Sequence, residues 1–130
     1  MQPDHAWAVA VSALCEADIT LYADASRDHN PLHLDREYAR GAGHETVIAH
    51  GMLGAGFLSS FIEEKFPGGF LKEFSVRFHN AVHLGVPMKA CGTIERIEHV
   101  GPEIIYDVSF CLTNAESVLT SGTAVVVVRK

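Results

Sequence analysis

The sequence predicts an α+β domain in which an antiparallel sheet wraps around one long central helix. Two observations lead to this prediction. Residues 50–66 are apolar on most sides of a helix, and the segments after residue 69 alternate apolar and polar residues as strands do. A helix that is apolar on most sides must be enclosed by other structure, and a sheet with one apolar face provides the enclosure.

Length and composition predict a single domain without a linker. The chain has 130 residues, of which 48% are hydrophobic, so we expect residues 1–130 to share one core. It contains no apolar run of about 18 residues, the length of a membrane span. The N-terminus carries an acidic residue and a histidine where a secretory signal carries basic residues. We therefore expect a soluble, cytoplasmic protein with no membrane partner.

Charge and cysteine content exclude further classes. The net charge of −6, without a cluster of lysine and arginine, repels a phosphate-rich duplex, so we expect no nucleic-acid partner. Cys15, Cys91 and Cys111 are odd in number, widely spaced and set in apolar segments. This pattern favours reduced core cysteines over a disulfide framework or a metal knuckle.

The first part of the chain predicts a strand followed by short helices. Residues 6–14 are apolar and partly β-branched, as in a strand, and residues 16–26 place apolar side chains at helical spacing. Asn30 followed by Pro31 is typical of an N-cap and the first residue of a helical turn. A further small helix follows, with Asp35 as its cap and glycines at its end.

The segment 50–66 predicts the longest helix. Gly51, Gly54 and Gly56 each lower helix stability by roughly 1 kcal/mol relative to alanine, so we expect close backbone approach by the sheet or a ligand in return. The Pro-Gly-Gly sequence at 67–69 ends the helix.

Four later segments predict strands, at residues 74–78, 86–98, 103–114 and 118–128. The last two turns between them are short enough for antiparallel hairpins. We expect a meander of about four strands, with a possible fifth strand from the N-terminus. A meander wrapped around one apolar helix is the hot-dog architecture.

The stretch "RDHNPLHLD" at 27–35 concentrates groups that can exchange protons. Adding water to an activated double bond, or eliminating it, requires a base and an acid, and a carboxylate and an imidazole that share one water suffice. Asp28 and His33 are the candidates, and the Asn30-Pro31 turn makes the loop between them rigid. The alternative is that Asp28 only caps the turn while His33 lies on the surface.

The start of the long helix offers a second candidate feature. Gly51 exposes backbone N–H groups at a helix N-terminus, where they suit the oxyanion that develops on a thioester carbonyl. A plain tight turn is the alternative. We expect His50 to be structural and to bond backbone near the helix start. Ser59 is eight residues beyond Gly51, on much the same side of the helix, and either supports the site by hydrogen bonding or permits close packing.

The histidines do not predict a metal site. His29 and His33 are four residues apart, as are His79 and His83, which on a helix places two imidazoles on one face. However, Pro31 and the strand-like context of the second pair disrupt that geometry, and the sequence has no HExxH motif or cysteine pair. We expect no metal, no other cofactor, and surface or loop positions for the second pair.

Two motifs carry a resemblance to a known family. The segments "YADASRDHNPLHLDREYARGAG" (22–43) and "VIAHGML" (47–53) resemble the (R)-specific enoyl-CoA hydratases, the hydratase-2 or MaoC-like group of hot-dog proteins. The D-x-N-P-[LI]-H motif matches at residues 28–33 and the A-H-G-M motif at 49–52. A looser similarity extends through residues 74–85.

The resemblance implies a role for each candidate residue. Asp28 and His33 would be the catalytic pair, Asn30 would orient their loop, the backbone N–H of Gly51 would bind the thioester oxygen, and Ser59 would support the site.

The resemblance also implies the reaction and the assembly. Water would add to trans-2-enoyl thioesters of coenzyme A or acyl-carrier protein to give (R)-3-hydroxyacyl thioesters, in a homodimer with sites at the subunit interface. Arg27 is a departure, because many relatives have glycine before the aspartate; it either alters the loop or contacts substrate.

Two other functions remain compatible with a hot-dog domain. One is an acyl-CoA thioesterase, which typically lacks the D-x-N-P-L-H loop. The other is a non-catalytic subunit that supports an active partner in a heterodimeric dehydratase. The intact pair of Asp28 and His33 argues against the second alternative.

Overall fold

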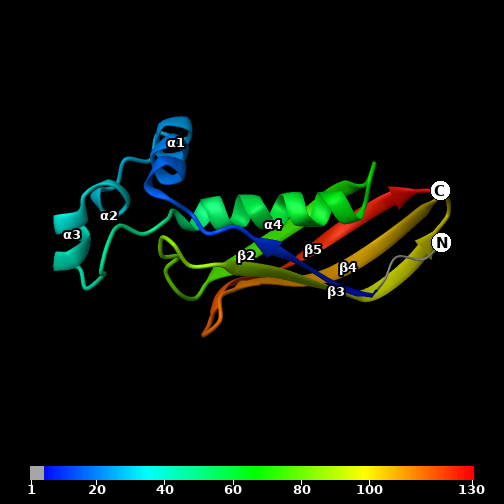
Figure 1. Cartoon of the computed structure of the whole chain (residues 1–130). Coiled ribbons are helices and arrows are strands. Elements are labelled where there is room, and N and C mark those ends of the chain that lie inside the picture. The colour runs from blue at the N-terminus through cyan, green and yellow to red at the C-terminus, as the bar shows by residue number, and fades with distance from the viewer. Residues whose placement is uncertain (1–4) are drawn as a thin grey trace.

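The chain forms a five-stranded antiparallel sheet with one long helix across it, which confirms the predicted α+β arrangement (Figure 1). The computed structural model describes residues 5–130, so the first four residues of the predicted 1–130 domain lie outside the described part. The strands are β1 (Ala6–Val11), β2 (Phe70–Phe78), β3 (Met88–Val100), β4 (Glu103–Thr113) and β5 (Val118–Arg129), and the helices are α1 (Glu16–Ser26), α2 (Pro31–Leu34), α3 (Arg36–Gly41) and α4 (Gly51–Lys65). No helix within residues 5–130 is long and apolar enough to cross a membrane.

The local predictions for the N-terminal half are confirmed. The predicted first strand is present as β1, although it ends at Val11, and α1 has the predicted bounds. Asn30 caps α2 with Pro31 in its first turn, and Asp35 caps α3 by accepting from two backbone amides. Each cap satisfies N–H groups that the first helical turn leaves without partners.

The strand order is β1-β3-β4-β5-β2, so the predicted four-stranded meander is wrong. Strands β3, β4 and β5 form a meander with short turns, but β2 pairs with β5 at one edge and β1 pairs with β3 at the other. The segment after β2 is a long connection rather than a hairpin turn. It passes the start of α4, where the amide of Ala49 donates to the carbonyl of Val82 at 2.8 Å.

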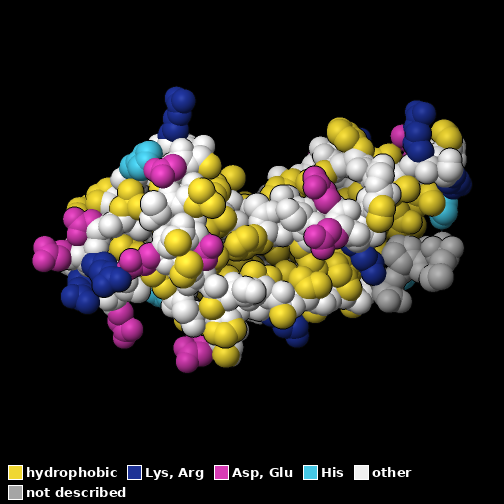
Figure 2. All heavy atoms as spheres, turned by 45° about the horizontal axis from the view of Figure 1, so that its top comes forward, with side chains coloured by type: hydrophobic (Ala, Val, Ile, Leu, Met, Phe, Trp, Pro, Cys, Tyr) yellow, Lys and Arg dark blue, Asp and Glu magenta, His cyan; other side chains and the backbone are white. Residues whose placement is uncertain are grey.

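The core lies between α4 and one face of the sheet. Alternate residues of β4 point into it, as predicted, and Leu58 and Ile62 of α4 are fully buried against them. The opposite side of α4 is open in the single chain, since Met52 is 59% exposed. Figure 2 shows hydrophobic side chains reaching the surface on this face of the molecule. The sheet therefore covers one side of α4 and does not enclose the helix as predicted.

Two of the three helix glycines are explained by close contact with the sheet. A Cβ on Gly51 would lie 3.0 Å from the ring of Phe78, and one on Gly54 would lie 3.3 Å from Leu112. A Cβ on Gly56 would have nothing within 4 Å, so the predicted close approach by the sheet does not occur at Gly56.

The cysteines are free, as predicted, but they do not lie in the buried core. Cys15 is exposed at the start of α1, while Cys91 and Cys111 are half-buried and face each other on β3 and β4. The strand period places this pair on the face of the sheet that points away from α4, since the neighbouring Ala90 is buried. Burial raises the pKa of the Cys111 thiol, and the neighbouring Cys91 adds to the shift.

Candidate active site

The loop between α1 and α2 holds the first candidate residue, Asp28. Before it, Arg27 ends α1 in the left-handed conformation with φ 60°, the one residue other than glycine with a positive φ within residues 5–130. After it, the Asn30 side chain accepts from the Leu32 amide at 3.0 Å. One carboxylate oxygen of Asp28 accepts from the Asn30 amide at 3.3 Å, so Asp28 does contact the turn. Its other oxygen has no hydrogen bond within the described residues.

His33 is held on α2 with a defined orientation. It is half-buried, and its Nδ1 lies 2.7 Å from the carbonyl oxygen of Ile48. Because a carbonyl only accepts, Nδ1 must carry the proton, which leaves the lone pair of the neutral ring on Nε2. The amide of Ile48 in turn donates to the carbonyl of Leu32 at 3.1 Å. The alternative of a free surface histidine is therefore wrong.

His50, at the N-cap of α4, joins the same cluster. Only 2% of the residue is exposed, and its Nε2 lies 2.9 Å from the carbonyl oxygen of Asp28. Its ring stacks on the ring of His33 with 3.8 Å between centroids and 25° between planes. His50 thus bonds backbone, as predicted, but in the loop that carries Asp28 rather than near the helix start.

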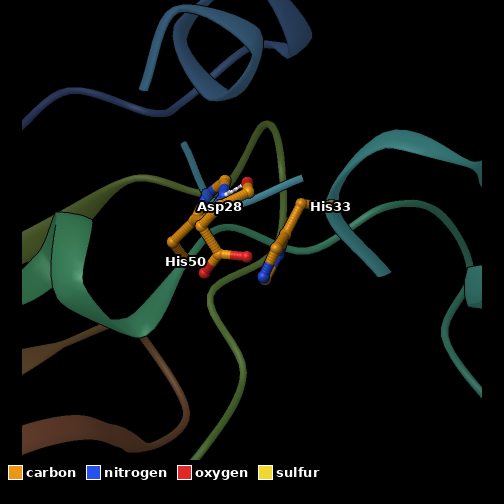
Figure 3. A group of neighbouring side chains, drawn as sticks. All are labelled: Asp28, His33 and His50. Atoms are coloured by element: carbon orange, nitrogen blue, oxygen red, sulfur yellow. Dashed lines mark hydrogen bonds between the residues drawn. The ribbon is translucent and has the colours of Figure 1, made fainter. Parts of the chain in front are cut away.

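The three side chains converge from different parts of the chain (Figure 3). One oxygen or nitrogen from each of Asp28, His33 and His50 lies within 4.8 Å of the other two. The predicted convergence of carboxylate and imidazole is therefore present. This arrangement suits a shared water better than a metal ion, because the lone pairs of two nearly parallel imidazole rings do not converge on one point.

A cavity of about 640 Å³ opens onto this cluster. The three clustered residues line it together with Gly51, Tyr22 and Phe78. Apolar walls with a few convergent polar groups are typical of a small-molecule site. The sequence did not identify Tyr22 or Phe78 as site residues, because each fits an apolar pattern of its own helix or strand equally well.

Gly51 lines the same cavity. It is the first residue of α4, and its amide makes no hydrogen bond within residues 5–130. The helix dipole adds partial positive charge at this end of α4. The position therefore fits a group that stabilises negative charge on a bound carbonyl oxygen.

Ser59 does not join the site. It is half-buried, its Oγ donates to the carbonyl of Gly56 at 2.9 Å, and it is absent from the residues that line the cavity. Eight residues of α-helix correspond to about 12 Å along the axis, so a residue on the same side of α4 as Gly51 still lies far from the pair.

The remaining histidines lie outside the cluster of Asp28, His33 and His50. His29 is exposed and lies 3.2 Å from Asp24, and His79 lies 2.7 Å from the hydroxyl of Ser121. His79 and His83 are exposed beyond β2, which confirms their predicted surface or loop positions.

Comparison with known proteins gives a family match over most of the chain. The family model described as "MaoC like domain" matches residues 2–114. The mitochondrial 3-hydroxyacyl-[acyl-carrier-protein] dehydratase of Arabidopsis thaliana is 43% identical over 68 residues, which is 52% of this chain and 41% of that protein. The (R)-specific enoyl-CoA hydratase of Rhodospirillum rubrum is 37% identical over 83 residues, which is 62% of this chain and 58% of that protein.

A solved structure shares the fold. The structure titled "(R)-hydratase from A. caviae involved in PHA biosynthesis" superposes with a TM-score of 0.85 and 24% identity, over 97% of this chain and 96% of that one. By contrast, the match to this chain covers only part of each of the two curated relatives, 41% of the Arabidopsis protein and 58% of the Rhodospirillum protein.

Proposed function

The chain belongs to the MaoC-like domain family, and from its site we propose that it is a hydratase of trans-2-enoyl thioesters. Water adds to the double bond to give an (R)-3-hydroxyacyl thioester, and the reverse reaction is a dehydration. The observation that carries the proposal is the convergence of Asp28 and His33 at the cavity that Gly51 also lines. The names of the two curated relatives support the same reaction on thioesters of coenzyme A or acyl-carrier protein.

In the proposed mechanism, Asp28 and His33 hold one water between them. The free carboxylate oxygen of Asp28 takes a proton from this water, and the resulting hydroxide forms a bond to the β-carbon. The α-carbon then receives the proton that the water gave to Asp28, either directly from the carboxyl group or through Nε2 of His33, which first accepts this proton on its lone pair. Negative charge that develops on the thioester oxygen is stabilised by the amide of Gly51.

We further propose that the chain is a homodimer joined at the edge of the sheet formed by β2. Within residues 5–130 the outer edge of β2 has no partner strand, and an unpaired edge readily adds another strand. Phe70 and Phe78 on β2 are 66% and 51% exposed. Because Phe78 also lines the cavity, a second copy at this edge would lie beside the site.

The mass in solution tests the assembly. We expect about twice the 14.1 kDa of one chain by light scattering at micromolar concentration. A mass of one chain under these conditions contradicts the homodimer.

The purified chain, assayed alone, tests the activity. With crotonyl-CoA we expect loss of the enoyl absorbance without release of free thiol. Release of thiol without hydration would instead identify a thioesterase. Turnover only after addition of a second protein would identify a non-catalytic subunit. A series of enoyl chain lengths on coenzyme A and on acyl-carrier protein then defines the preferred substrate.

Loss of the cap that holds α2 should lower both stability and turnover. Asn30→Ala removes the acceptor for the Leu32 amide, which is expected to cost about 1 kcal/mol of unfolding free energy. Turnover should fall as well, because α2 carries His33. The matched control is Asn114→Ala, which removes a similar acceptor for the Glu116 amide in the turn between β4 and β5. The control should lose stability and keep its turnover; equal turnover in both variants contradicts a role for Asn30 in the site.

A further inference from the structure

His50 is buried in the candidate site, yet the proposed mechanism gives it no task. Its ring stacks on the ring of His33, with 3.8 Å between centroids, and meets the ring of Tyr22 edge to face, with 4.9 Å between centroids. Its Nδ1 is buried without a hydrogen-bond partner within the described residues. A buried polar atom without a partner is unfavourable, so the position would be more stable with an apolar ring if packing were its only purpose.

The hydrogen bonds define which nitrogen of His50 carries its proton. Its Nε2 lies 2.9 Å from the carbonyl oxygen of Asp28, which can only accept, so Nε2 is the protonated nitrogen of the neutral ring. The bond joins residues that are 22 positions apart in the chain. It therefore links the loop that carries the carboxylate directly to the N-terminus of α4.

This link connects the groups that must act together. Asp28 lies in an exposed loop, whereas the Gly51 amide is the first of α4 and directly follows His50. The hydrogen bond from His50 to the backbone of Asp28 therefore fixes the position of the carboxylate relative to that amide. The His50 ring also stacks on the imidazole of His33. This contact limits how far that imidazole can turn while it keeps its hydrogen bond to the Ile48 carbonyl.

We propose that His50 is a positioning residue that keeps Asp28 and His33 at fixed positions relative to the Gly51 amide. The kinetic effects that we expect from this role rest on the proposed hydratase function. Small displacements of acid-base groups lower the rate of the chemical step more than they weaken binding of a substrate held elsewhere.

Two substitutions separate positioning from packing. His50→Phe keeps an aromatic ring in contact with Tyr22 and His33 but loses the donor to the Asp28 carbonyl, and it removes the unpartnered Nδ1. We expect an equal or higher Tm, a kcat at least tenfold lower, and a KM changed by less than about threefold. His50→Gln loses the ring but places an amide N–H close to the former Nε2, so its kcat should exceed that of His50→Phe.

A control defines the effect of lost packing alone. Ile62→Val, in the core on α4 and outside the cavity lining, should lower Tm and leave kcat unchanged. The proposal is overturned if His50→Phe keeps the wild-type kcat, if its loss of kcat occurs only together with a loss of Tm, or if a folded His50→Gln is no more active than His50→Phe.

A spectroscopic measurement keeps this test independent of the activity. In uniformly labelled protein, the ¹³C resonance of the Asp28 carbonyl should move upfield in His50→Phe and return toward the wild-type position in His50→Gln. An unchanged resonance in His50→Phe overturns the positioning role. If the wild-type chain hydrates no enoyl thioester, the proposed function fails, while these resonances still decide whether His50 holds the Asp28 loop.

Discussion

Replacing Asp28 with asparagine is expected to lower kcat for enoyl-thioester hydration by about two to four powers of ten. Asparagine keeps an oxygen that can accept from the Asn30 amide, a bond of 3.3 Å in the present site, so the turn should persist. It cannot take a proton from water, so the base is lost. Steady-state kinetics with crotonyl-CoA measure the effect, and circular dichroism checks the fold.

His33→Ala should produce a loss of similar size, because it removes the imidazole whose Nε2 is free for the shared water. The matched control is His29→Ala. This histidine comes from the same loop, but it is exposed and contacts Asp24 rather than the cavity, so kcat should remain close to the wild-type value. Near-normal hydration by both Asp28→Asn and His33→Ala would refute the assignment of the catalytic pair.

Gly122→Ala is expected to have the largest effect on stability, with a loss of about 3 kcal/mol, the upper end of the usual cost of overpacking. Gly122 on β5 lies between Val76 of β2 and Phe110 of β4. A Cβ there would overlap the carbonyl oxygen of Ser75 and would lie 2.7 Å from the ring of Phe110. A backbone carbonyl in a paired strand cannot move without breaking the β2–β5 ladder. Since small domains are stable by only about 5–15 kcal/mol, urea denaturation should detect this readily.

Gly56→Ala is the matched control for the added methyl group. Gly56 lies inside α4, and its Cβ position has nothing within 4 Å, so alanine should raise stability by up to about 1 kcal/mol. If Gly122→Ala were as stable as Gly56→Ala, the close pairing of β2 with β5 would be incorrect.

The elements of the fold were predictable wherever their signals are local. The Asn30 cap and the alternation along β4 depend on residues that are neighbours in the chain, and both are present. The position of β2 was not predictable in the same way. Alternation identifies a strand and its buried face, but it does not determine which strand it pairs with, and β2 pairs with β5 rather than with β3.

The same distinction applies to the site. Asp28 and His33 lie on one short loop and turn, so local sequence was enough to identify them as neighbours, although the orientation of His33 also depends on the carbonyl of Ile48, 15 residues away. The bond from His50 to Asp28 spans 22 residues and depends on how α4 meets the loop, which no local pattern specifies. For Ser59 the sequence left support of the site and close packing open, and Ser59 is not among the residues that line the cavity, because helical periodicity gives the side of a helix but not the distance along its axis.

The stereochemistry of water addition in D₂O tests most directly whether Asp28 and His33 act on one shared water. Both groups converge on the same point of the cavity, so oxygen and deuterium should reach adjacent carbons from the same face of the double bond. We expect syn addition to trans-2-crotonyl-CoA, with the (R) configuration at the carbon that carries the hydroxyl. Anti addition would contradict a single water held between the carboxylate and the imidazole.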